Sequence, residues 1–107
     1  MAELRRNTVA LVTTEFVLIE VANAFCASAW RTKAVKLIDG LRSVPNLKII
    51  EADSSLLSEG WRLYCSRLDK EWSLTDCVSF AVMHDEQINQ AFTSDHHFEQ
   101  AGFIKLL

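Results

Sequence analysis

The chain has 107 residues, a formal net charge of −3 and 50% hydrophobic residues. Its length allows one small domain with a modest core. The negative charge excludes a general polyanion-coating protein, because nonspecific nucleic-acid binding needs a basic face that neutralises phosphates; RNA stays open as a substrate. The high apolar content predicts a homo-oligomer or a partner that covers apolar surface.

The cysteines and the hydropathy pattern indicate the compartment. The three cysteines show no C-x-x-C spacing and lie in apolar helical patterns, so we expect buried free thiols at Cys26, Cys65 and Cys77. No signal peptide precedes the first strand-like run, and no apolar segment reaches the roughly eighteen residues that a membrane span needs. We therefore expect a cytoplasmic protein with no membrane association.

The first half of the chain alternates strand-like and helical patterns. Short β-branched runs are typical of buried parallel strands, Thr13 or Thr14 is suited to cap a helix, and Pro45 ends a helical pattern. In chain order we expect the tail of a helix over residues 1–7, a strand over 9–12, a helix from Glu15 to about Ser28, a helix from about Trp30 to Arg42 and a strand over 47–50.

The second half continues this alternation. Asp53 or Ser54 is suited to cap one helix and Ser73 the next, and Gly102 precedes a last strand. We expect helices from residue 54 to about 68 and from 74 to about 84, a strand over 91–94, helical turns over 96–101 and a strand over 103–106. The order β-α-α-β-α-α-β-α-β predicts one α/β domain over residues 1–107, with a parallel sheet covered by helices on both faces.

Three carboxylates stand out against this framework. Asp76 opens a helix and Asp95 ends a strand, and in a parallel sheet such positions on one side line the crevice where ligands bind. Glu20 lies on a mostly apolar helix face with Asn23 as its only polar helical neighbour. Burying an unpaired carboxylate costs several kcal/mol, so we expect a cation or hydrogen-bond donors to meet it.

Each acid also has a purely structural interpretation. Asp76 follows Ser73 at the spacing of a capping box, Asp95 is suited to cap the turn that holds His96 and His97, and Glu20 is open to a salt bridge or partial exposure. Together the three acids favour Mg²⁺ or Mn²⁺, which prefer carboxylate oxygens and water. The chemistry that such a centre supports is phosphodiester hydrolysis by an activated, oriented water.

Other candidate motifs carry less weight. Adjacent side chains on a helical turn point in different directions and there is no H-x-x-x-H spacing, so we do not expect His96 or His97 to bind metal. The tryptophans favour core or interface packing over base stacking, because no basic and aromatic interleaving surrounds Trp30, Trp61 and Trp72. With three glycines in all, no phosphate-binding loop is present.

Three blocks, TTEFVLIEVANAF, SLTDCVSFAVM and AFTSDHHFEQAGF, resemble successive blocks of the PIN-domain ribonucleases known as VapC-type toxins. The resemblance covers nearly the whole chain and implies a PIN-like three-layer fold, with a parallel sheet flanked by helices. By position it implies that Glu20, Asp76 and Asp95 are the catalytic, metal-binding acids of a Mg²⁺- or Mn²⁺-dependent endoribonuclease, with Ser73 and Thr93 as supporting hydroxyls. It further implies an RNA substrate, a homodimer and a cognate antitoxin protein.

One departure from the family limits this expectation. The family opens with a short central strand that ends in a fourth metal-binding aspartate, and residues 1–107 contain no counterpart of that strand. We therefore expect an N-terminally truncated domain with weak or absent nuclease activity, because three carboxylates position an attacking water poorly. The alternative is a noncatalytic PIN-fold remnant that binds an antitoxin or another partner. A third option is a DNA nuclease or RNA-processing relative on the same fold.

Overall fold

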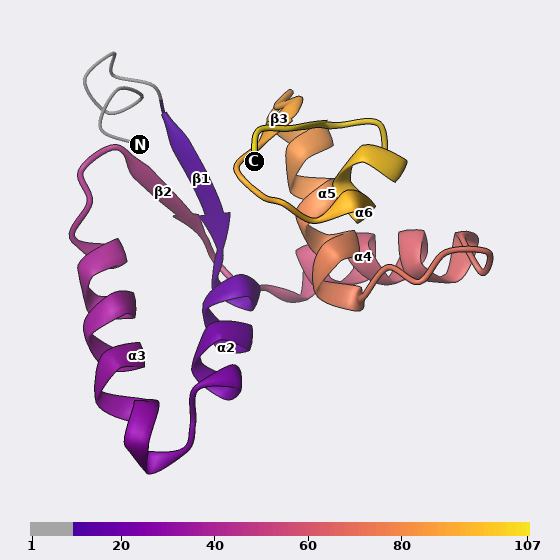
Figure 1. Ribbon diagram of the computed structural model, residues 1–107. Helices are drawn as coiled ribbons and strands as arrows, with labels where there is room; N and C mark the ends of the chain where they lie inside the picture. Colours follow the sequence, from indigo (N-terminus) through magenta and orange to yellow (C-terminus); the bar gives the residue numbers. More distant parts are fainter. Residues whose placement is uncertain (1–9) are drawn as a thin grey trace. The chain divides into compact units, whose positions relative to one another are not determined.

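The structure is a computed structural model that describes residues 10–107 (Figure 1). The helix tail predicted over residues 1–7 and the start of the first predicted strand lie outside the described residues. The elements in chain order are β1 (Leu11–Thr14), α2 (Glu15–Ala24), α3 (Ser28–Arg42), β2 (Leu47–Ile50), α4 (Ser54–Ser66), α5 (Leu74–Asp85), β3 (Gln90–Ala91), α6 (His96–Gln100) and β4 (Ile104–Lys105). The predicted alternation of strands and helices is confirmed.

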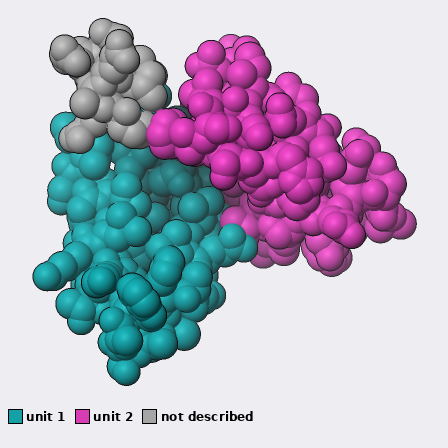
Figure 2. Space-filling view, viewed as in Figure 1, with its two compact units in different colours: residues 1–52 teal, residues 53–107 magenta. Residues whose placement is uncertain are grey.

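Contacts along the chain divide it into two compact units, residues 1–52 and residues 53–107, which Figure 2 colours separately. Each unit contains one pair of strands, and both pairs are parallel, as the sequence predicts. The described residues form two two-stranded sheets, β1-β2 and β3-β4. The prediction of a single domain, and that of a missing central strand, stay predictions.

The first unit is a strand–helix–helix–strand segment. Leu11 lies opposite Leu47 and Thr14 opposite Ile50 in the parallel register. The hydroxyl of Thr14 accepts a hydrogen bond of 3.2 Å from the amide of Val17, which makes Thr14 the cap of α2. A buried threonine at this position therefore ends the strand and begins the helix in one step.

Helix α2 ends earlier than its apolar pattern predicts, at Ala24 instead of about Ser28. The guanidinium group of Arg31 donates two hydrogen bonds, of 3.0 and 2.8 Å, to the carbonyl oxygen of Cys26. These bonds fix the turn between α2 and α3, and α3 begins at Ser28. The early end of α2 thus coincides with a local side-chain-to-backbone contact in the turn that follows it.

The second unit has a core centred on the ring of Phe80, on α5. The Phe80 ring centroid lies 5.1 Å from that of Trp72, 4.9 Å from that of Phe98 and 5.6 Å from that of Phe103. The Trp72 indole donates a hydrogen bond of 3.0 Å to the side-chain oxygen of Gln100, so its polar edge is satisfied inside the core. These contacts join the start of α5 to α6 and to the chain before β4.

Strands β3 and β4 are shorter than predicted. The amide of Thr93 donates to the carbonyl of Ala91 at 3.0 Å, a tight local turn that ends β3. Backbone pairing nonetheless continues irregularly, because the amides of Leu106 and Leu107 donate to the carbonyls of Ala91 and Thr93. The turn leads the chain to Asp95, directly before α6.

The predicted burial of the cysteines is correct for one of three. All three thiols are free, but Cys77 is buried while Cys26 and Cys65 are exposed. Cys26 lies in the turn between α2 and α3, and Cys65 in the last turn of α4. Of the tryptophans, Trp72 belongs to the core. None of the helices in residues 10–107 has the length and apolar character to cross a membrane.

Candidate metal centre

Asp76 lies in the first turn of α5 and forms the predicted capping box with Ser73. The Ser73 hydroxyl accepts a hydrogen bond of 2.9 Å from the Asp76 amide, and the Asp76 Oδ2 atom accepts one of 3.2 Å from the Ser73 amide. Two amides that a helix start would leave without partners are thereby satisfied. The carboxylate is held in one orientation, and the Ser73 hydroxyl is committed to the cap.

Asp95 is the cap of the five-residue helix α6. Its Oδ1 atom accepts a hydrogen bond of 2.9 Å from the amide of His97, and its own amide donates one of 3.1 Å to the hydroxyl of Thr93. The structural interpretation of this acid is therefore confirmed. The Thr93 hydroxyl thus holds the backbone of Asp95; its role as a supporting hydroxyl in catalysis stays a prediction.

The two aspartates meet at one imidazole nitrogen. The Nδ1 atom of His97 lies 3.4 Å from Oδ2 of Asp76 and 3.3 Å from Oδ1 of Asp95. The side chains of His97 and Asp76 are each 20% exposed and that of Asp95 is 37% exposed. Acids from α5 and α6 therefore share one half-buried location, as the sequence predicts for this pair; their role in catalysis stays a prediction.

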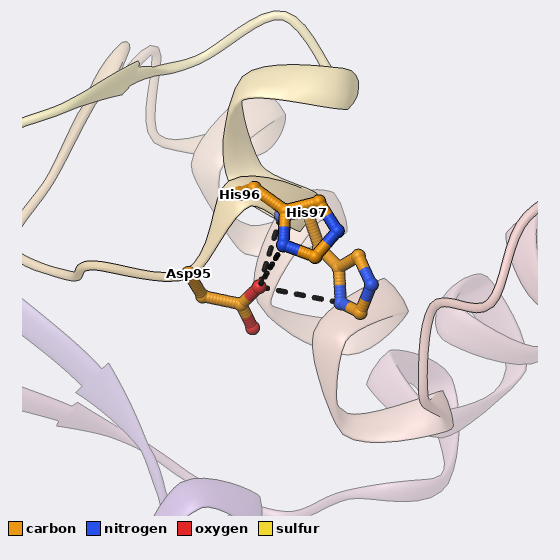
Figure 3. Close-up of side chains that lie close together, drawn as sticks. All are labelled: Asp95, His96 and His97. Carbon is orange, nitrogen blue, oxygen red and sulfur yellow. Dashed lines mark hydrogen bonds and ion pairs between the residues drawn. The ribbon is translucent and has the colours of Figure 1, made fainter.

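The side chains of His96 and His97 do not point in different directions, as their adjacent positions on a helical turn predict. The rings of His96 and His97 lie side by side, with centroids 4.4 Å apart, and the Asp95 carboxylate faces both of them (Figure 3). The His96 Nδ1 atom lies 3.8 Å from Oδ1 of Asp95, and its side chain is 69% exposed. The sequence signal for this contact was the predicted helix cap. The Asp95 carboxylate accepts a hydrogen bond from the His97 amide, and this bond keeps the His97 side chain close to the carboxylate.

Glu20 does not have the buried environment that its apolar neighbours predict. It is exposed on α2, a ten-residue helix in which Leu18 is the buried residue. The helix buries too narrow a face for the neighbours of Glu20 to enclose it. Glu20 belongs to residues 1–52 and the two aspartates belong to residues 53–107. Its participation in a shared centre stays a prediction.

An open cavity of about 510 Å³ adjoins the capping box, because Ser73 and Cys77 line its wall. Aromatic rings border it on α4, where Trp61 and Tyr64 stack with centroids 5.3 Å apart and an interplanar angle of 15°. Arg67 also lines it and forms a two-bond fork with Asp69, at 3.0 Å for each bond. This fork lowers the pKa of Asp69 to about 2.

Two of the tryptophan rings lie close to cationic side chains. The Arg67 guanidinium lies 5.2 Å from the ring of Trp72, and the Lys33 ammonium lies 4.9 Å from the ring of Trp30. Such distances are typical of cation–π contacts. Of the three tryptophans for which core or interface packing is predicted, Trp72 packs in the core, whereas Trp30 and Trp61 are about half exposed.

A divalent ion fits the donors that meet at His97. Two carboxylates and one imidazole are a donor set that Mn²⁺ accepts, whereas Mg²⁺ prefers oxygen ligands alone. The Nδ1 atom is buried and, within residues 10–107, has no hydrogen-bond partner. Asp95, His96 and His97 also satisfy by themselves the spacing of a metal-binding group, with one donor atom from each within 4.8 Å of the others.

Comparison with known proteins relates the chain to a family. The PIN domain family matches residues 2–104. Two curated relatives, both named 23S rRNA-specific endonuclease VapC20, come from Mycobacterium tuberculosis strains CDC 1551 / Oshkosh and ATCC 25618 / H37Rv. Each is 32% identical over 66 residues, which cover 62% of this chain and 49% of the relative. The matched region thus spans about half the length of the curated relatives.

The fold has a solved counterpart. The crystal structure of Mycobacterium tuberculosis VapC20, described as a Sarcin-Ricin loop cleaving toxin, matches with a TM-score of 0.81 at 24% sequence identity. The match covers 96% of this chain and 79% of that chain. The predicted PIN-like α/β fold is therefore confirmed.

Proposed function

Because the chain belongs to the PIN domain family, we propose that it supplies the carboxylates of a divalent-metal-dependent endoribonuclease of the VapC toxin type. The observation that carries this proposal is the meeting of Asp76 and Asp95 at one nitrogen, within 3.4 Å of each. Two anionic side chains at one half-buried location favour a cation between them. Glu20 is the third proposed carboxylate.

Hydrogen bonds within the chain would orient the carboxylates that hold the metal ion. The capping box fixes the direction of the Asp76 carboxylate, and the bond from the Asp95 amide to Thr93 fixes the chain before α6. Their charges would hold Mg²⁺ or Mn²⁺, which acidifies a water and stabilises charge on the leaving oxygen when bound. Little else is required of the protein, since phosphodiester hydrolysis depends mainly on positioning and electrostatics.

The proposed substrate class is RNA. It follows from the relatives named as a 23S rRNA-specific endonuclease, which share 32% of their residues with this chain over the matched region. The cavity beside Ser73 supports an extended ligand, because stacked aromatic rings and a cation line a space of about 510 Å³ next to the capped carboxylate. The site of cleavage is a property for direct measurement.

The proposed partners are a second copy of the chain and a cognate antitoxin, in the cytoplasm. Exposed large apolar side chains support a partner, because such surface is costly to leave in water. Leu68 is the clearest case, with 88% of its surface exposed, and Trp61 is 53% exposed. Sedimentation velocity of the purified protein tests the homodimer, and co-expression with the adjoining reading frame tests the antitoxin.

The decisive experiment compares the protein with its Asp95→Asn variant. We expect Mn²⁺ to raise the melting temperature of the unaltered protein and the variant to lose this shift. RNA cleavage should require the metal and be abolished by the substitution. A chain that gains no stability from either metal, and whose partner binding is unchanged in the variant, would instead be the noncatalytic binding module.

A further inference from the structure

We propose that His97 binds the metal ion through its Nδ1 atom, together with Asp76 and Asp95, and that this nitrogen makes the centre prefer Mn²⁺ to Mg²⁺. The inference rests on the proposed metal binding by the two aspartates and adds to it a neutral nitrogen ligand. The sequence blocks that suggest a carboxylate centre do not assign any role to this histidine.

The first observation is an unsatisfied nitrogen. Among the described residues, Nδ1 of His97 is a buried polar side-chain atom without a hydrogen-bond partner. Buried polar atoms are satisfied in the large majority of cases, so an exception requires a physical explanation. Here two carboxylate oxygens are close by, at 3.3 and 3.4 Å, yet neither contact has the geometry of a hydrogen bond.

The second observation is the spacing of the donors. Atoms bound to one ion at about 2.1 Å are separated by about 3.0 Å along an octahedral edge and about 3.4 Å along a tetrahedral edge, from the usual metal–ligand lengths. The two measured separations from Nδ1, 3.3 and 3.4 Å, agree with this range. Each separation is therefore short enough for one ion to bind both Nδ1 and the carboxylate oxygen concerned.

His96 provides a contrast within the same turn. Its Nδ1 atom lies farther from Asp95, at 3.8 Å, and its side chain is 69% exposed against 20% for His97. Within residues 10–107 the ion-pair contact of His96 is with Asp95, whereas His97 contacts both aspartates. His97 is therefore the histidine that contacts both aspartates, and His96, whose donor atom also lies within 4.8 Å of those of Asp95 and His97, is compared with it in the test below.

An imidazole ligand has a consequence for metal choice. Mg²⁺ binds carboxylate and water oxygens and accepts nitrogen poorly, whereas Mn²⁺ and other transition metals accept imidazole. Replacing the nitrogen should consequently weaken Mn²⁺ binding much more than Mg²⁺ binding. A histidine that only holds α6 in place would change the affinity for both ions in parallel.

The direct test is pulsed electron paramagnetic resonance of Mn²⁺ bound to the full chain. We expect a ¹⁴N coupling from a directly bound nitrogen in the unaltered protein, converted to a ¹⁵N coupling when histidine is isotopically labelled. The coupling should persist in His96→Gln and disappear in His97→Gln. This measurement on the unaltered protein needs no variant to fold, and absence of any nitrogen coupling to bound Mn²⁺ overturns the inference.

Affinity measurements complete the test. We expect His97→Gln to lower Mn²⁺ affinity by about tenfold or more and to leave Mg²⁺ affinity, measured by competition, within about twofold, since only the nitrogen ligand is lost. Equal losses for the two ions overturn the proposal. Failure of Mn²⁺ to bind the unaltered protein at all would overturn the proposed nuclease centre as well, whereas Mn²⁺ bound only through oxygen would overturn the role of His97 alone.

Discussion

The Oδ2 atom of Asp76 lies 3.4 Å from Nδ1 of His97, so α5 and α6 meet through a carboxylate and an imidazole. The same oxygen accepts the Ser73 amide at 3.2 Å. One atom thus serves the start of a helix and the proposed metal centre. Substitutions at Asp76 therefore need variants that separate the two roles.

Two substitutions at Asp76 should separate helix capping from metal binding. Asp76→Asn keeps an oxygen that accepts the Ser73 amide, whereas Asp76→Ala removes it. Without metal, we expect Asp76→Ala to be less stable than Asp76→Asn by about 0.5–2 kcal/mol, the usual worth of a cap contact. Both variants should lose stabilisation by Mn²⁺. Urea unfolding with and without Mn²⁺ measures both effects; an Asn variant that Mn²⁺ still stabilises fully would exclude Asp76 as a ligand.

Helices α4 and α5 approach each other closely at Gly60. A Cβ atom at this position would lie 2.4 Å from Cγ2 of Val78 and 3.1 Å from its Cα. Because the backbone of α5 stands in the way, we expect Gly60→Ala to lower the free energy of unfolding by about 1–3 kcal/mol. Chemical denaturation of the variant provides the measurement.

Gly40 is the matched control for this substitution. It lies inside α3, and a Cβ atom there would meet nothing within 4 Å. Gly40→Ala should raise the free energy of unfolding by up to about 1 kcal/mol, the difference in helix propensity between the residues. If Gly60→Ala proved as stabilising as Gly40→Ala, the close approach of α4 and α5 would be refuted.

The three thiols should differ in reactivity. Burial, followed by the nearby charge of Asp76, raises the pKa of the Cys77 thiol, whereas Cys26 and Cys65 are exposed. The thiolate is the reactive form, and a raised pKa together with exclusion from solvent suppresses it. At pH 8 a thiol reagent should modify Cys26 and Cys65 rapidly and Cys77 only on unfolding. Mass spectrometry of the labelled peptides identifies each site, and rapid labelling of Cys77 in the folded protein would contradict its burial.

A pair of acids between α4 and α5 should make stability depend on pH. The protonated carboxyl of Glu59 donates a hydrogen bond to Asp85, and this bond together with the negative charge of Asp85 raises the pKa of Glu59 above its ordinary value of 4.5. The folded protein therefore binds this proton more tightly than the unfolded chain. The resulting stabilisation is present below about pH 4.5 and is lost as the pH rises through the higher folded value.

Glu59→Gln should remove that dependence. We expect the variant to be more stable than the unaltered protein at pH 7, where two carboxylates repel, and to show little gain at pH 4. Glu51→Gln, at an exposed acid of residues 1–52, controls for the change in net charge. Melting temperatures across this range test the prediction, which a pH-independent gain would rule out.

Local sequence signals predicted most of the elements, because caps and breaks act over a few residues. Ser73, Asp53 and Thr14 cap helices where the pattern placed caps. The elements that differ in length end at local turns that the apolar pattern does not indicate. The Arg31 side chain fixes the turn that ends α2, and the turn at Thr93 shortens β3.

For the candidate site too, features set by local sequence signals were predictable, and features set by packing between helices were not. The positions of Asp76 and Asp95 at helix starts were predictable from spacing alone: Asp76 completes the capping box of α5, and Asp95 caps α6. Their common contact with His97 was not, because it depends on how α6 packs against α5. Burial of Glu20 was predicted wrongly, since periodicity indicates which residues share a face and not whether another element covers that face.

The ring of Phe80 is the common contact of three other aromatic rings in the second unit. Its ring touches the rings of Trp72, Phe98 and Phe103, which come from the approach to α5, from α6 and from the approach to β4. Because these segments pack on the same ring, we expect them to lose their packing in the same unfolding step. The two aspartates should therefore keep their mutual spacing up to the temperature at which this aromatic cluster melts and lose it in the same transition, so that fluorescence of the buried Trp72 reports the integrity of the acid pair.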